Sequence, residues 1–194
     1  MGTRNLTAVY MDGEYKVAQY GQWDGYPEGQ GIICLHFLRD KLNEKCFKDN
    51  LIKLRFTKDE EQKALAKEFG ARDDGTIRID DYEKFRRAYP ELHRDTGAKI
   101  LEMIQEGRAR ILNNDINFAA DGLFCEWAWV IDFDKRTFEA YQGFKKEQLT
   151  ENDRFYYLRD LEENGYSGVK IVHEWKIDEL PTDEVFLSAF DEED

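Results

Sequence analysis

The sequence predicts a layered α+β domain in which helices cover a mostly antiparallel sheet. Three observations carry this prediction: a hairpin pattern at the start, a run of capped helical segments in the middle, and a return of strand patterns in the last third. The chain has 194 residues, of which 41% are hydrophobic, enough for one sizeable core. We expect a single domain over residues 1–178, for which an αββα arrangement of layers is one form.

The first two strands are expected at residues 6–11 and 15–22. They are joined by Asp12-Gly13, a dipeptide that strongly indicates a tight hairpin. Both faces of the first strand are apolar, since Leu6, Ala8 and Tyr10 alternate with Val9 and Met11. A strand that is apolar on both faces lies between two layers, so we expect this one inside the sheet.

Four helical segments are expected next, at residues 31–42, 57–70, 79–89 and 95–107. The first is apolar over too wide an arc for a surface helix, so we expect it to lie against the sheet. The others carry the usual end signals, which are a Thr57–Glu60 capping box and stops at Gly70, Pro90 and Gly107.

Strand patterns return at residues 123–133 and 137–144, joined by a short turn. In the first of them one apolar face is uninterrupted, with Leu123, Cys125, Trp127, Trp129, Ile131 and Phe133. A helix is expected over residues 150–163, where Thr150 and Asp153 form a capping box and Gly165 stops the helix. The segment 168–175 supplies the last strand.

The charge of the chain is strongly negative, at −13, with 41 acidic residues against 28 basic ones. This argues against direct binding of nucleic acid, which needs basic surface, and it fits attraction to a basic partner. Residues 178–194 hold eight acids and no base. Such charge runs are usually solvated, so an acidic C-terminal tail is expected over 179–194.

The three cysteines are scattered and form no C-x-x-C pair, which indicates free thiols in a reducing compartment. No apolar run approaches the roughly 18 residues of a membrane span, and the start is too polar for a signal peptide. We therefore expect a cytoplasmic protein that does not bind membranes.

No cofactor or metal is expected. The chain lacks the P-loop, G-x-G-x-x-G and G-x-S-x-G motifs. The segment "DDGTIRIDDYEKF" has part of the spacing of a calcium loop, but Gly70 and Arg72 fall on the first and third ligand positions and cannot supply an anionic oxygen. The three histidines have no zinc-binding spacing.

Glu126 is the most unusual acidic residue, because Phe124, Ala128 and Val130 share its face of the expected strand. A buried carboxylate needs a partner or shifts its pKa upward. Arg4 and Arg94 are the expected partners. A structural ion pair is favoured over a reactive acid.

The loop after the second strand suggests a binding site. Gly29 and Gly31 precede a helix whose bare amides could bind an anion, although Glu28 already brings negative charge there and glycines also serve simple turns. Asp24 is a second candidate acid, and its alternative, purely structural role is to cap its own turn. The expected ligand is a small anion, and its expected contacts are Arg4, Trp23, Asp24, Gly29, Gly31 and Arg94.

Several strings resemble an uncharacterised family of small proteins from phage and prophage genomes. They are "GTRNLT", "AQYGQWDGYPEGQG", "RDTGAKILEMI" and "FAADGLFCEWAWVIDFD", and the resemblance runs over most of the chain. It implies a phage-associated setting in the host cytosol. Together with the missing catalytic motifs, it favours a non-catalytic accessory protein that binds a host macromolecule or a small signalling ligand, with counter-defence as one role.

A looser likeness links the first thirty residues to N-terminal-nucleophile amide hydrolases such as the bile-salt hydrolase group. It rests on a strand, an Asp-Gly turn and a return to Asp24 after loss of Met1. Gly2 carries no nucleophile, so only its removal would leave Thr3 leading. The alternative hypothesis is therefore an amide hydrolase with Thr3 or Cys125 as nucleophile and Asp24 or Glu126 assisting.

Overall fold

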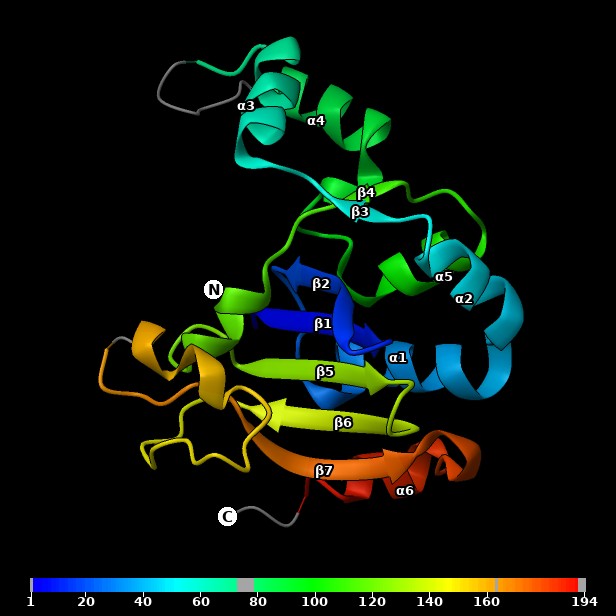
Figure 1. The fold of residues 1–194 in the computed structure, drawn as a ribbon, viewed down its shortest axis with the longest axis vertical. Coiled ribbons are helices and arrows are strands. Elements are labelled where there is room, and N and C mark those ends of the chain that lie inside the picture. The colour runs from blue at the N-terminus through cyan, green and yellow to red at the C-terminus, as the bar shows by residue number, and fades with distance from the viewer. Residues whose placement is uncertain (1, 73–78, 163, 192–194) are drawn as a thin grey trace.

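The computed structural model describes residues 2–72, 79–162 and 164–191 (Figure 1). Its main sheet has five strands in the order β2-β1-β5-β6-β7. Three of its four strand pairs are antiparallel, and helices pack on it, so the predicted α+β class is confirmed. The strands are β1 (Asn5–Met11), β2 (Glu14–Gly21), β5 (Trp127–Asp132), β6 (Thr137–Gln142) and β7 (Lys170–Lys176).

The predicted hairpin is present, and its first strand lies inside the sheet. Asp12 and Gly13 have φ values of 56° and 79°, the pair of positive angles that a tight two-residue hairpin turn requires. β1 pairs with β2 on one side and with β5, in parallel, on the other. Leu6, Ala8 and Val9 are fully buried, as expected for a strand covered on both faces.

The apolar helical segment after the hairpin lies against the sheet, as predicted. It starts earlier than expected and runs through Pro27–Gly31, α1 (Ile32–His36) and Phe37–Lys41. A Cβ at Gly31 would stand 2.7 Å from the ring of Trp129, so this glycine allows the helical backbone to approach β5 closely. The indole Nε1 of Trp129 donates to Gly25 O at 2.9 Å, which fixes the start of the segment.

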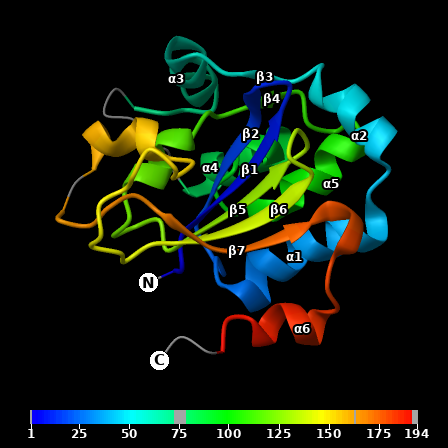
Figure 2. The ribbon, with the colours of Figure 1, turned by 60° about the horizontal axis from the view of Figure 1, so that its bottom comes forward.

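Two cores lie on opposite faces of the main sheet. One is covered by α1, α2 (Glu44–Leu51), α5 (Ile100–Gln105) and α6 (Asp183–Ser188), with Trp129 at its centre. The other is covered by the 3₁₀ segments Ile116–Ala120 and Tyr156–Leu161. Figure 2 shows α1 and α6 on one side of the sheet and the long loops between β6 and β7 on the other.

A smaller unit stands at one end of the molecule (Figure 1). It holds β3 (Arg55–Phe56) paired in parallel with β4 (Ile111–Leu112), together with α3 (Asp59–Glu68) and α4 (Ile79–Ala88). Gly70 follows α3 with a φ of 80°, and α4 ends just before Pro90, as predicted. Residues 73–78, which hold part of the segment considered as a calcium loop, lie outside the described residues.

Two capping predictions are corrected. Lys58 rather than Thr57 precedes α3, because the Thr57 hydroxyl is used to bond Leu112 O of β4 at 3.3 Å. Thr150 and Asp153 do bond, with the Thr150 amide 2.6 Å from Asp153 Oδ2, but they close a turn. Only the shorter 3₁₀ helix Tyr156–Leu161 follows in place of the expected helix over 150–163.

The C-terminal segment is not the expected solvated tail. Within it, Thr182 caps α6 by accepting from the Val185 amide at 3.4 Å. Phe186 is fully buried, with ring centres 5.9 Å from Trp129 and 4.9 Å from Trp175. The described acids of this segment lie outside the core, whereas Phe186 and Phe190 pack in or against it, so the count of acidic residues alone led to a wrong prediction.

The expected apolar face over residues 123–133 is also corrected. β5 begins at Trp127, because residues 121–125 form a turn in which the Cys125 amide donates to Asp121 O at 2.7 Å. Cys125 therefore packs with Ala128 and Val130, on the face opposite to Trp129. In the described part of the chain, no helix is long and apolar enough to cross a bilayer.

Candidate functional site

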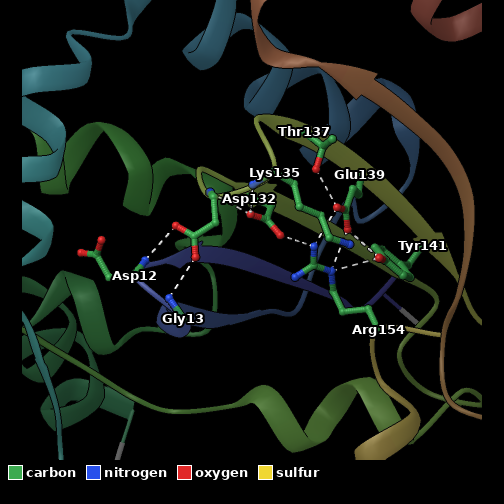
Figure 3. A network of polar contacts seen from close by, with 9 residues as sticks. Asp12, Gly13, Asp132, Lys135, Thr137, Glu139, Tyr141 and Arg154 are labelled. Carbon is green, nitrogen blue, oxygen red and sulfur yellow. Dashed lines mark hydrogen bonds and ion pairs between the residues drawn. The ribbon is translucent and has the colours of Figure 1, made fainter. Parts of the chain in front are cut away.

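An arginine and two carboxylates form a buried ionic cluster against the second face of the sheet (Figure 3). Asp132 ends β5, and Glu139 lies in the middle of β6. Both carboxylate side chains are 1% exposed. Arg154 comes from the loop that follows β6, and its side chain is 10% exposed. Since β6 alternates its side chains, Thr137, Glu139 and Tyr141 share this face while Phe138 and Ala140 enter the opposite core.

Glu139 is held by four donors. Arg154 bonds it through both Nη2 and Nε, to Oε1 and Oε2, each at 2.7 Å. The Tyr141 hydroxyl donates to Oε2 at 2.6 Å, and the Thr137 hydroxyl donates to Oε1 at 2.7 Å. A two-point arginine–carboxylate bond with further donors is the arrangement that makes a buried ion pair tolerable.

Asp132 links this cluster to the turns of both hairpins. Its Oδ2 bonds Arg154 Nη2, and its Oδ1 accepts from the amides of Asp134 at 2.9 Å and Lys135 at 2.8 Å. Asp134 in turn accepts from the amides of Asp12 and Gly13, both at 2.9 Å. These two backbone donors lower the pKa of the Asp134 carboxyl. The turns at one end of the sheet are thereby tied together (Figure 3).

A pocket of about 550 Å³ opens beside the cluster. Its aromatic walls are Tyr10, Tyr15, Tyr141 and Tyr157, and its acids are Asp132, Asp134, Glu139, Asp153 and Glu174. Against these five acids stand two cations, Lys135 and Arg154. Burial raises the pKa of the Tyr15, Tyr141 and Tyr157 hydroxyls, so these rings are neutral at pH 7.

Glu174 gives the pocket an unbalanced charge. It lies on the edge strand β7, directly opposite Glu139 in the β6–β7 pair. Like charges at opposed positions of a sheet repel. Glu139 shares the charge of Arg154 with Asp132, but within the described residues no cationic side chain lies within ion-pair distance of Glu174. The exposed carboxylate of Glu174, which lines this acidic and aromatic pocket, is therefore available to a cation of another molecule.

The residues that the sequence predicts as a ligand site gather elsewhere, around the N-terminal segment. Trp23 Nε1 donates to Asp95 Oδ1 at 3.0 Å, and Asp24 accepts from the Tyr26 hydroxyl at 3.2 Å. The amides of Gly29 and Gly31 both donate to Tyr26 O, at 3.0 and 3.5 Å. These two amides are thus already engaged.

The expected side-chain partners of Glu126 are not found. Its Oε1 accepts from the backbone amide of Arg4 at 3.3 Å. The Arg4 guanidinium instead lies 4.3 Å from the ring centre of Phe124. Arg94 is exposed and lies 3.9 Å from Asp95. Because Glu126 precedes β5 rather than lying within it, the carboxylate is only half-buried, and a backbone donor satisfies it.

The candidate nucleophiles lie close to the same segment. Thr3 O accepts from the Gly25 amide at 2.9 Å. Gly2 is packed so tightly that a Cβ there would stand 2.3 Å from the Trp23 ring. Cys125 is fully buried, and its Sγ donates to Trp127 O at 3.5 Å. Burial, with the neighbouring charges of Asp121 and Glu126, raises the pKa of this thiol well above its usual value, which opposes formation of the nucleophilic thiolate.

One thiol is therefore expected to react quickly in the native protein. Cys46 is exposed, whereas Cys34 and Cys125 are buried and burial raises the pKa of both thiols. A disulfide reagent at pH 8 should label Cys46 at the rate of a free thiol and the other two more slowly by roughly a hundredfold or more. Peptide mass mapping against time measures this. Fast native labelling of Cys125 would instead support the hydrolase hypothesis.

Sequence reasoning missed Asp132, Glu139 and Arg154. The alternation in "TFEAYQ" was a usable signal, because it places Thr137, Glu139 and Tyr141 on one strand face. Nothing local connects Arg154 to that face, since the loop that carries it is irregular. Among the described residues, no group of three or more His, Cys, Asp or Glu is placed to hold a metal ion.

The Arg154 pocket is lined by Tyr10, Tyr15, Tyr157 and Glu174 and by Asp132, Glu139 and Arg154, which together form the Arg154 cluster; it is the candidate site on this face of the sheet. No protein-family model, no curated protein and no solved structure matches the chain.

Proposed function

We propose that the protein is a non-catalytic binding protein whose Arg154 pocket receives an arginine side chain of a basic partner protein. The observation that carries the proposal is the excess of acids over bases in an aromatic pocket, where Glu174 has no counter-ion among the described residues. In the phage-associated setting that the sequence resemblance implies, the partner would be a host protein. Its capture would serve counter-defence.

Arginine fits this pocket better than other cations. A guanidinium stacks on aromatic faces and bonds carboxylates at two points, whereas an ammonium does neither as well. The protein's own Arg154 already shows this chemistry, because its Cζ lies 5.4 Å from the ring centre of Tyr10 while its nitrogens bond Glu139. The net charge of −13 would speed the approach of a basic partner.

The bonding of the cluster supports binding over catalysis. A general acid or base must reach a substrate proton. Both oxygens of Glu139 and of Asp132 already accept bonds from the protein itself. The hydrolase hypothesis, with Thr3 or Cys125 as nucleophile, has less support, because Cys125 is fully buried with a raised thiol pKa and Thr3 leads the chain only after removal of Gly2.

The test is calorimetric titration with a capped peptide that holds two arginines among glycines. Glu174→Gln is expected to weaken binding roughly three- to fivefold, the effect of one partly exposed charge pair. Tyr157→Leu is expected to weaken it by a similar factor, roughly threefold, through loss of cation–π attraction. Replacing the arginines of the peptide by lysines should also weaken binding.

Glu60→Gln is the matched control, since it removes the same charge from the exposed surface of α3. We expect it to change affinity less than about 1.5-fold at physiological salt. Glu174→Gln removes a repulsion with Glu139, so the free energy of unfolding of this variant should not fall. Weaker binding by the variant would therefore not result from unfolding. Equal effects of the Glu174 and Glu60 variants would overturn the proposal, because attraction would then come from net charge alone.

A further inference from the structure

A second pocket, of about 460 Å³, lies between α4 and the segment from Pro90 to Met103. Three cations line it, Arg86, Arg87 and Lys99, together with His93 and two acids, Glu83 and Asp95. It is separate from the Arg154 pocket and has no lining residue in common with it.

His93 lines this pocket, and its imidazole carries a donor that is unpaired among the described residues. The residue is 3% exposed, and its ring packs on Tyr82 with the ring centres 4.9 Å apart. The amide of Asp95 donates to His93 Nδ1 at 3.1 Å, which places the imidazole proton on Nε2. Nε2 is buried and has no hydrogen-bond partner among the described residues. Burial lowers the pKa of His93, so the ring is a neutral donor at pH 7.

The acids of the pocket are already engaged. Glu83 lies 3.5 Å from Arg86. Asp95 accepts from Trp23 Nε1 at 3.0 Å and lies 3.9 Å from Arg94 Nε. Within the described residues, neither Arg87 nor Lys99 has an acidic side chain within ion-pair distance. The lining therefore carries three positive charges against two negative ones, in a protein whose net charge is −13.

We propose that this pocket binds a small phosphate-bearing ligand. Arg87 and Lys99 supply the two charges that balance a phosphate dianion, and His93 Nε2 donates the hydrogen bond that it lacks in the free protein. A buried donor without an acceptor is costly, so an acceptor at this position contributes to affinity as well as to selectivity. The sequence also predicts a small anionic ligand, but at Gly29 and Gly31, whose amides are engaged elsewhere.

Phenyl phosphate is the probe, titrated into the full chain and followed by calorimetry. Arg87→Gln and Lys99→Gln are each expected to weaken binding roughly tenfold, as is usual for loss of a charge-assisted hydrogen bond. Lys53→Gln is the matched control, because this exposed lysine, whose Nζ donates to Asn50 Oδ1 at 3.0 Å, does not line the pocket. It should change the affinity less than about 1.5-fold.

A second readout follows His93 directly. With imidazole nitrogens labelled, the Nε2–H resonance should shift on addition of phenyl phosphate, as the proton gains an acceptor, and the shift should saturate at the calorimetric affinity. The proposal is overturned if no binding is detected, if the Nε2–H resonance is unmoved at saturation, or if Lys53→Gln weakens binding as much as Lys99→Gln does. Benzoate should bind more weakly, because it carries a single charge.

Discussion

Replacing Arg154 by methionine is expected to lower the free energy of unfolding by about 3–5 kcal/mol at pH 7. The substitution keeps much of the side-chain volume and removes the charge that Asp132 and Glu139 share. Two carboxylates, each 1% exposed, would then lie in adjacent strands without a cation. Removal of one partner of a buried ion pair costs far more than removal of the whole pair. Urea unfolding followed by far-ultraviolet circular dichroism measures the loss.

A surface variant checks that the loss comes from the buried cluster. Arg159→Met is the control. Its exposed guanidinium lies 4.3 Å from the ring centre of Tyr156, so the expected loss is below about 1 kcal/mol. Similar losses for both variants would mean that the Arg154 cluster does not hold the sheet as described.

Replacing Phe186 by alanine is expected to cost about 3–5 kcal/mol, the usual range for a fully buried aromatic ring. Phe186 lies between Trp129, Phe138 and Trp175, with ring centres 4.9 to 6.0 Å away. For a chain of this size, that loss lowers the melting temperature by roughly 6–20 °C. Differential scanning calorimetry of the variant and the parent protein gives the value.

Val185→Ala is the neighbour control for this second experiment. Val185 is 57% exposed, and substitutions at such surface positions usually change stability by less than about 0.5 kcal/mol. If Phe186→Ala were as mild as Val185→Ala, residues 179–191 would be the solvated tail that the charge pattern predicts. A large gap between the two variants shows that α6 is part of the main core.

The features that the sequence predicts well are those with a local cause. Asp12-Gly13 fixes a hairpin through its own backbone preferences, and Gly70 and Gly107 end helices by adopting positive φ values. The parallel pairing of β1 with β5 could not be predicted from the sequence, because more than a hundred residues separate the two strands and no turn connects them. The C-terminal helix was missed because eight acids hid the role of one buried phenylalanine.

The candidate site was less accessible still. The sequence singles out two acids, Asp24 and Glu126, because each has aromatic or apolar neighbours in the sequence. Asp24 is satisfied by a local bond from the Tyr26 hydroxyl, and Glu126 by a bond from the Arg4 backbone amide, which is distant in the sequence. The Arg154 cluster depends on an irregular loop that folds back over two strands, an arrangement that leaves no periodic trace in the sequence.

Nuclear magnetic resonance titration of the labelled protein with the two-arginine peptide tests the proposed function most directly. If the Arg154 pocket binds the peptide, the resonances of Tyr15, Tyr157 and Glu174 should shift together and saturate, and Glu174→Gln should weaken the response roughly three- to fivefold. Saturable shifts confined to another surface, or shifts around Glu174 that grow linearly and survive Glu174→Gln, would contradict an arginine-binding pocket on this sheet.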